Sequence, residues 1–107
     1  MKLDINVENK TAGVVSVAVQ GDVTLQTSPA LRSQLKPLFS QENKQIHVDL
    51  SGVGFMDSSG IATLVEGLQW ARNTDGRFVL HALQANVLDV FNLAKLDTVF
   101  EIVEADA

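Results

Sequence analysis

The run Asp57-Ser58-Ser59-Gly60 combines an acid with two hydroxyl groups, and its chemistry is the most specific in this sequence. It follows a strand pattern that ends at Leu50, and it precedes a helical pattern. Serine is favoured at helix N-caps, where its hydroxyl accepts a hydrogen bond from a first-turn amide. One of the two serines should therefore be the N-cap, and this structural role alone would explain the run.

The same position suits a second role, in which a serine hydroxyl accepts a phosphate. A helix N-terminus offers unpaired amides and about half a positive charge, and a phosphoserine carries about −1.5 to −2. Asp57 lies beside the serines and would repel that charge. The fold would tolerate the new group, whereas a partner protein would meet a changed surface.

Enzymatic chemistry finds less support in the sequence. The Gly-x-Ser-x-Gly motif of many serine hydrolases is absent, although a small hydrolase that uses Ser58 stays an alternative. His47 and His81 each lie inside a strand pattern, which favours a packed or surface histidine over a catalytic base. The two histidines have no metal-ligand spacing, and no glycine-rich loop for phosphate is present. We expect no enzyme, no metal and no cofactor.

Composition narrows the class of protein further. The chain has 107 residues, of which 46% are hydrophobic and 20% charged, as expected for one folded domain over residues 1–107. It has no cysteine, which excludes disulfides and thiol chemistry. The net charge of −5 argues against a nucleic-acid partner. No apolar stretch approaches the length of a membrane span, so we expect a cytoplasmic protein without membrane insertion.

Strand and helix patterns alternate along the chain. Apolar residues with a period of two predict strands over residues 3–7 and 46–50, and further strands are predicted over residues 14–20, 77–82 and 99–103. Helices fit between them, which gives the order β-β-α-β-α-β-α-β. This order predicts an α/β domain with a mostly parallel, mixed sheet of about five strands and helices packed on it. The first two strands should form a hairpin, with the first as an antiparallel edge.

The first and third helices carry recognisable start signals. Ser28 followed by Pro29 fits an N-cap and a first helical position, while Pro37 predicts that this helix is short or kinked. Asn86 with Asp89 three positions later predicts a capped third helix. Its predicted inner face consists of Val87, Val90, Phe91 and Ala94.

The helix after Ser59 carries one tryptophan, and two interpretations of it stay open. The predicted inner stripe of this helix is Ile61, Leu64, Val65 and Leu68. Trp70 falls about opposite that stripe, where it would be an exposed interface anchor or would fold under the neighbouring helix. If Trp70 is exposed, it shares a helix with Ser58 and belongs to the same docking surface.

Two blocks of the sequence resemble a known family. Residues 48–60, Val-Asp-Leu-Ser-Gly-Val-Gly-Phe-Met-Asp-Ser-Ser-Gly, resemble the signature of STAS domains. The upstream run Gly-Asp-Val-Thr at 21–24 and Ser-Pro-Ala-Leu-Arg at 28–32 resemble the same family's second-strand exit and first helix. The resemblance covers essentially the whole chain, and it is to bacterial anti-sigma factor antagonists.

The resemblance implies a partner-switching function. The unphosphorylated protein would bind an anti-sigma factor that is also a serine kinase of the GHKL type, which would free a sigma factor. Phosphorylation of Ser58 would block binding, and a PP2C-type phosphatase would reverse it. Ser59 is the second candidate for the phosphorylated residue. The expected partner-binding residues are Asp22, Thr24, Asp57, Ser58, Ser59, Gly60 and Trp70.

Two points qualify what the resemblance implies. Thr24 stands where family members often carry an acid, so kinase recognition or partner choice can differ here. The alternative function is a STAS subunit with a structural docking role in a lipid-transport ABC complex or a larger signalling assembly. In that alternative the serine only caps the helix, and the same helix face docks a nucleotide-binding subunit.

Overall fold

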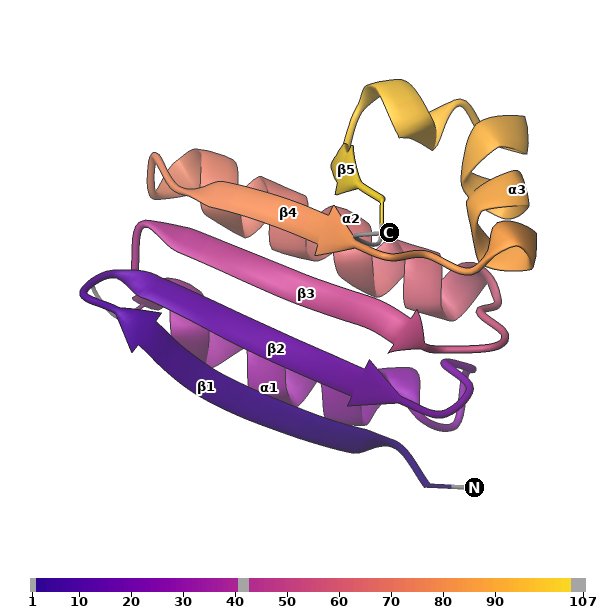
Figure 1. Cartoon of the computed structure of the whole chain (residues 1–107), viewed down its shortest axis with the longest axis horizontal. Coiled ribbons are helices and arrows are strands. Elements are labelled where there is room, and N and C mark those ends of the chain that lie inside the picture. The colour runs from indigo at the N-terminus through magenta and orange to yellow at the C-terminus, as the bar shows by residue number, and fades with distance from the viewer. Residues whose placement is uncertain (1, 41–42, 105–107) are drawn as a thin grey trace.

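A five-stranded mixed sheet forms the centre of the computed structural model, which describes residues 2–40 and 43–104. The strands lie in the sheet in the order in which they occur along the chain (Figure 1). They are β1 (Asp4–Thr11), β2 (Val14–Gln20), β3 (Gln45–Gly52), β4 (Arg77–His81) and β5 (Glu101–Val103).

The pairing of the strands confirms the predicted α/β class. β1 pairs antiparallel with β2 as a hairpin, and β2, β3, β4 and β5 pair in parallel. A parallel pair needs a crossover connection, and each of these connections contains a helix. The sheet is therefore mostly parallel with one antiparallel edge, as the alternation of patterns predicted.

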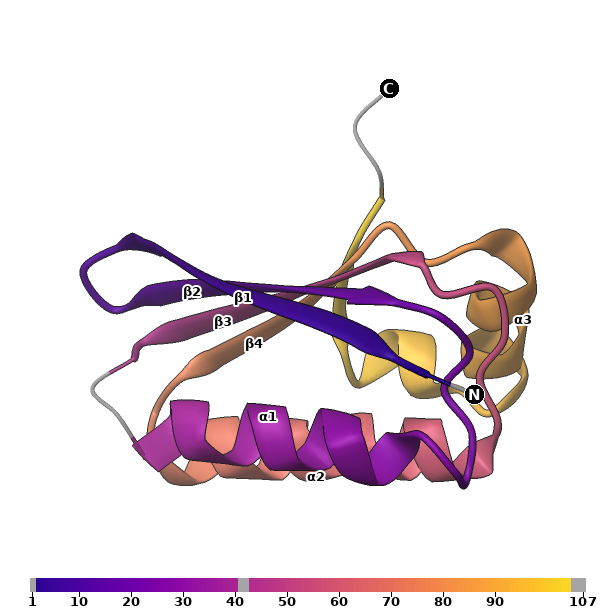
Figure 2. The same ribbon diagram turned by 90° about the horizontal axis from the view of Figure 1, so that it is seen from below.

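The two longest helices cover one face of this sheet. α1 (Ser28–Ser40) and α2 (Ser58–Asn73) lie side by side beneath it, while α3 (Ala85–Leu93) lies at one end (Figure 2). A short 3-10 helix, η1 (Leu96–Thr98), leads from α3 to β5. Among residues 2–40 and 43–104, no helix is both long and apolar enough to cross a membrane.

The core lies between the sheet and the two helices. Alternate residues of β2 and β3 point toward the helices and are buried, as a period of two requires. The helices contribute leucines and phenylalanine to the same cluster. Its fully buried centre includes Val15, Val17, Val19, Ile46, Val48, Leu50, Leu31, Leu35 and Leu64.

The first helix differs from its prediction at both ends. It begins at Ser28 itself, because the Thr27 carbonyl accepts the hydrogen bond of the Leu31 amide at 3.4 Å. It then continues through Pro37 to its end at residue 40, so the short helix given as one alternative was wrong. Burial of Phe39 in the last turn favours the continued helix, despite the hydrogen bond that proline removes.

The buried face of α2 is rotated from the predicted stripe. Gly67 lies against the Phe78 ring of β4, where a Cβ atom would come within 2.8 Å of the Phe78 Cζ atom. Glycine allows this close approach because it has no side chain. It is not counted as apolar when a buried face is predicted from the sequence, so its burial was not predicted. The apolar residues of the predicted stripe other than Leu64 are only partly buried. The buried residues of the helix are Gly60, Thr63, Leu64, Gly67 and Ala71.

The predicted cap of α3 was also wrong. Gln84 occupies the N-cap position and makes no side-chain capping bond, and the helix begins at Ala85. Asn86 lies inside the first turn, and its side-chain amide donates to the Gly54 carbonyl at 2.6 Å instead.

The inner face of α3 is narrower than predicted. Val87 and Phe91 are buried, whereas Val90 and Ala94 are exposed. The following strand begins at Glu101 rather than Val99, because the amides of Val99 and Phe100 still donate to the Leu96 carbonyl of η1, each at 3.0 Å.

Candidate functional site

Two loops meet at the edge of the sheet where β2 and β3 end. The loop after β2 pairs with the loop after β3, because the Val23 amide donates to the Phe55 carbonyl at 2.9 Å. The Asp57 amide donates in turn to the Val23 carbonyl at 3.0 Å. Val23 and Met56 form an isolated parallel bridge, and both side chains are buried. The two loops therefore behave as one bridged unit.

Asp57 is the N-cap of α2, so the prediction that one of the serines caps this helix was wrong. One carboxylate oxygen, Oδ1, accepts the amides of Ser59 at 2.9 Å and Gly60 at 3.3 Å. The other, Oδ2, accepts the amide of Leu25 at 2.9 Å. Aspartate and serine cap helices about equally well. Aspartate has a second oxygen, which here also binds the neighbouring loop.

These hydrogen bonds favour the charged form of Asp57. The Ser59 hydroxyl donates to Oδ1 at 2.5 Å, and it is the largest cause that lowers the pKa of this carboxyl. The backbone amides of Leu25, Gly60 and Ser59 lower the pKa further, against partial desolvation. Hydrogen bonds to a carboxylate stabilise its ionised form, so a negative charge is fixed at the start of α2.

The two serines differ in what their hydroxyl groups do. The Ser59 side chain is half-buried and its hydroxyl is bonded to Asp57. Ser58 is the first residue of α2 and its side chain is exposed. Within the described part of the chain, no hydrogen bond engages the Ser58 hydroxyl. Only Ser58 therefore offers an accessible, uncommitted hydroxyl at this helix start.

Gly60 allows the two loops to lie close to α2. A Cβ atom at this position would lie 2.6 Å from Met56 Cγ and 2.7 Å from Val23 Cγ1. Both distances are shorter than real Cβ contacts, so any side chain here would push the bridged loops away. Gly60 thus contributes to the shape of the site and offers no functional group of its own.

Asp22 and Thr24 belong to the same site through the loop after β2. The Thr27 hydroxyl donates to the Asp22 carbonyl at 2.7 Å and accepts the Thr24 amide at 2.8 Å. These bonds brace the loop, and the Asp22 side chain stays exposed. The structure therefore gathers Asp22 and Thr24 with the run that begins at Asp57.

Comparison with known protein families decides the class of this domain. A family model described as "Mlab, STAS domain" matches residues 7–104. The chain belongs to the STAS domain family. This finding confirms the resemblance noted in the sequence, and the observed order of strands and helices fits it.

Several proteins similar to this STAS domain have names or structures. An "Anti-sigma-B factor antagonist" of Bacillus subtilis is 25% identical over 101 residues, which cover 94% of this chain and 92% of that protein. The crystal structure of an anti-sigma factor antagonist from Mycobacterium paratuberculosis has a TM-score of 0.87 at 25% identity, over 97% of this chain and 87% of that one.

A third similar protein is known in a modified form. The structure of the Bacillus cell fate determinant SpoIIAA in the phosphorylated form has a TM-score of 0.78 at 19% identity. The match covers 96% of this chain and 92% of that one. At this level of identity, the likeness shows that the two proteins share the STAS fold.

Trp70 lies apart from the other predicted residues of this STAS domain. Its ring packs against Phe39 of α1, with 5.6 Å between the ring centroids, and the side chain is half-buried. The Arg32 guanidinium lies 5.5 Å from the centroid of the same ring. Trp70 is also about 18 Å from Ser58 along the helix axis, at about 1.5 Å per residue. The interpretation in which Trp70 packs against the neighbouring helix fits these contacts.

Four residues near the site were not recognised in the sequence. Leu25 and Phe55 are 75% and 50% exposed, and they belong to the two bridged loops. Gln84 and Asn86 donate to the carbonyls of Ser51 and Gly54, and so they hold the loop after β3 from the side of α3. Leu25, an apolar residue between the polar residues Thr24 and Gln26, is the signal that the sequence offers for the first pair, whereas Phe55 is adjacent to the buried Met56 and carries no such signal. The role of Gln84 and Asn86 could not be predicted from a local sequence pattern, because their hydrogen-bond partners lie more than 30 residues away in the sequence.

The two histidines lie on the face of the sheet that the helices leave uncovered. His47 and His81 are half-buried, and their rings contact one another. Partial burial is the largest cause that lowers the pKa of His47, and the charges of His81 and Arg77 act in the same direction. Glu101 acts in the opposite direction. Neither histidine belongs to the site around Ser58.

Proposed function

We propose that this STAS domain is an anti-sigma factor antagonist that binds its anti-sigma factor through the site around Ser58. The names of similar proteins along nearly the whole chain support this function. The exposed apolar side chains of Leu25 and Phe55 supply contact area beside Ser58, since apolar side chains that a partner covers contribute to binding.

The observation that carries the proposal is the exposed, unbonded hydroxyl of Ser58 at the start of α2. Because Asp57 caps the helix, Ser58 has no capping task to perform. Ser58 therefore lacks the structural role that the alternative docking function assigned to it. A kinase could modify Ser58 without breaking a hydrogen bond of the fold.

Phosphorylation of Ser58 would switch binding off by electrostatics. The positive end of the helix dipole at the start of α2 favours an anion, whereas the ionised Asp57, which already binds the amides of Ser59 and Gly60, opposes it. The fold therefore tolerates a phosphate of about −1.5 to −2 charges with little net change in stability. At an interface the same charge would have to be desolvated beside Leu25 and Phe55, and such a mismatch costs several kcal/mol.

The partners follow from the family resemblance and are part of the proposal. The anti-sigma factor would also be the serine kinase, of the GHKL type, and a PP2C-type phosphatase would restore the free hydroxyl. The antagonist and both of these partners would act in the cytoplasm. Thr24, which lies beside the site, replaces a frequent acid and would adjust which kinase is recognised.

Phosphate mapping tests the proposal directly. The full chain is incubated with the GHKL-type kinase of the same genome and ATP, and the modified residue is located by mass spectrometry. We expect one phosphate on Ser58 and none in Ser58→Ala, and in Ser59→Ala, the matched control, we expect the phosphate to remain on Ser58. Phosphate on another residue, or full phosphorylation of Ser58→Ala, would contradict the proposal.

A further inference from the structure

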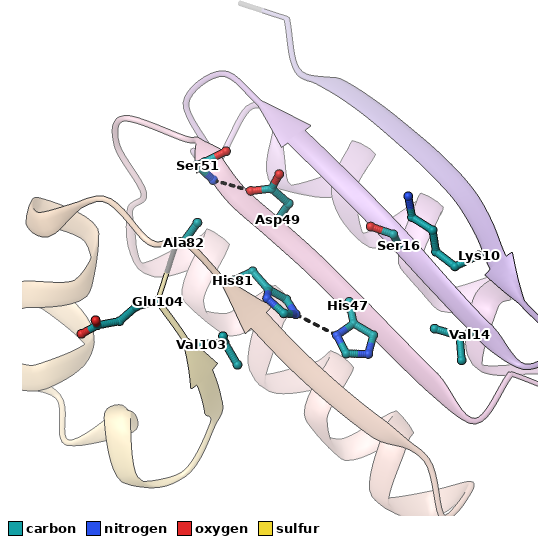
Figure 3. Close-up of a pocket in the computed structure, with 10 residues that line it drawn as sticks. All are labelled: Lys10, Val14, Ser16, His47, Asp49, Ser51, His81, Ala82, Val103 and Glu104. Atoms are coloured by element: carbon teal, nitrogen blue, oxygen red, sulfur yellow. Dashed lines mark hydrogen bonds between the residues drawn. The ribbon is translucent and has the colours of Figure 1, made fainter. Parts of the chain in front are cut away.

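A groove of about 560 Å³ lies on the uncovered face of the sheet (Figure 3). His47 of β3 and His81 of β4 form its centre, and their side chains point toward one another. Asp49 precedes the end of β3 on the same face, and it is the register partner of His81. The pair is created by the parallel register of the two neighbouring strands β3 and β4.

The two imidazoles approach as closely as two ligands of one metal ion. His47 Nδ1 lies 2.7 Å from His81 Nε2, and the ring centroids are 5.0 Å apart. Two nitrogens bound at about 2.0–2.1 Å would be about 2.9 Å apart at a right angle and about 3.4 Å apart at a tetrahedral angle. The observed 2.7 Å is the length of a hydrogen bond between the rings and is shorter than both values, so the rings would have to move slightly apart to bind an ion. The smaller movement is needed at the right angle, which is the angle between neighbouring ligands of a tetragonal ion.

Gln45 orients the first of the two rings. His47 Nε2 lies 2.9 Å from the side-chain oxygen of Gln45, and an amide oxygen can only accept a hydrogen bond. Nε2 of His47 therefore carries the hydrogen, and Nδ1 keeps its lone pair toward His81. A ring nitrogen that donates to an oxygen while the other faces the ion is the usual arrangement of metal-binding histidines.

We propose that His47 and His81 form a binding site for a divalent transition-metal ion that favours tetragonal coordination, such as Ni²⁺ or Cu²⁺. Imidazole nitrogen suits both ions, and both favour square-planar or tetragonal sites of nitrogen and oxygen. Binding replaces the hydrogen bond between the rings with two metal–nitrogen bonds. The hydrogen on His81 Nε2 moves to Nδ1 of the same ring, so no proton is lost.

Water supplies the remaining ligands of the ion. Across residues 2–40 and 43–104, no group of three or more histidine, cysteine or acidic side chains could hold a metal. The groove is open to solvent, and Asp49 and Glu104 are among its lining residues. Arg77, a nearby cation, is paired with Glu101. Two protein ligands give a reversible site rather than a permanently loaded one.

Titration of the full chain with NiCl₂ alone tests this site. We expect a single saturable site by calorimetry, with NMR signals of β3 and β4 broadened around His47 and His81. His47→Gln and His81→Gln should each weaken binding at least tenfold. Ser16→Ala, which changes another side chain of the same groove, should leave binding unchanged.

Two results would overturn the site. Broadening centred on other residues of the wild-type chain would place the ion elsewhere, whatever the variants do. Equal Ni²⁺ affinity of the wild type and both histidine variants would show that the imidazoles do not bind the ion. Circular dichroism establishes that each variant is folded. MgCl₂, whose ion prefers oxygen ligands, should cause no broadening at the two histidines.

Discussion

Ser58 and Ser59 carry the same hydroxyl group, yet their surroundings give them different chemistry. The Ser59 hydroxyl donates a hydrogen bond to Asp57, whereas the Ser58 side chain is exposed to solvent at the first position of the helix. The decisive group is the Asp57 carboxylate, which binds two amides of its own helix and one amide of the neighbouring loop. One aspartate thus fixes the helix start, joins the loops and leaves the first serine free.

The charge of Asp57 predicts a pH dependence of stability. Because the pKa of this carboxyl is lowered in the folded state, its ionised form stabilises the protein above the unfolded-state pKa of about 3.9. That contribution is lost as the pH falls through the lower pKa of the folded state. Asp57→Asn keeps a side chain that can cap a helix, and it removes the charge.

Urea unfolding at pH 7 and near pH 3 measures this effect. We expect the wild type to be more stable than Asp57→Asn at pH 7, and we expect the difference to shrink steadily below about pH 4. A difference between the two proteins that stays constant across this pH range would mean that the carboxylate charge has no part in the stability of the site.

The bridged loops depend on how closely α2 approaches them. Val23, Met56 and Gly60 occupy a space in which a single added methyl group has no room. The loop after β3 is held on its other side by Gln84 and Asn86 from the start of α3. The geometry around Ser58 is therefore determined by three segments that are distant in the sequence. They are the loop after β2, the loop after β3 with the start of α2, and the start of α3.

Gly60→Ala tests the importance of this close approach. The added Cβ atom would meet Met56 Cγ and Val23 Cγ1, and such overpacking costs about 1–3 kcal/mol, partly offset by the better helix propensity of alanine. The variant should lose stability in urea unfolding and should also bind the anti-sigma factor more weakly than its folded fraction explains.

Gly67→Ala is the matched control in the same helix. Its Cβ atom would meet Phe78 Cζ at 2.8 Å, so it also destabilises the protein, but far from the loops. We expect its folded fraction to bind the partner as the wild type does. Equal loss of binding in both variants would show that the loop geometry does not determine recognition.

The sequence predicted the elements better than their contacts. The period-two pattern of residues 46–50 identified β3, because alternate residues of this strand are buried under α1 and α2. The cap of α2 was missed because aspartate and serine are comparable caps, and only the amide of Leu25 makes Asp57 the better one. The buried face of α2 was missed because Gly67 is buried without being apolar.

At the scale of the whole molecule, the fold separates three surfaces. The helices cover one face of the sheet, the histidine groove lies on the other, and the Ser58 site lies at the edge where β2 and β3 end. The crevice outside the carboxyl ends of parallel strands is a common place for binding sites. The run that begins at Asp57 was predicted to lie at this edge of the sheet and does lie there, whereas Leu25 and Phe55 were not identified from the sequence.

Leu25 and Phe55 should contribute to partner binding without contributing to stability. Both side chains are largely exposed, so Leu25→Ala and Phe55→Ala should change the free energy of unfolding by less than about 0.5 kcal/mol. Each should weaken binding of the anti-sigma factor at least tenfold, or about 1.4 kcal/mol. Leu93→Ala, at an 86% exposed position at the end of α3, is the matched control. Unchanged affinity in both loop variants would exclude this surface from the interface.

The central claim is that a phosphate on Ser58 releases the partner while the domain stays folded. It is tested most directly by calorimetric titration of the anti-sigma factor with the unmodified chain and with the chain phosphorylated on Ser58. We predict at least a hundredfold loss of affinity, or about 2.7 kcal/mol, with the same thermal midpoint for both forms. Equal affinity of the two forms, or a phosphorylated form that is unfolded, would contradict the account.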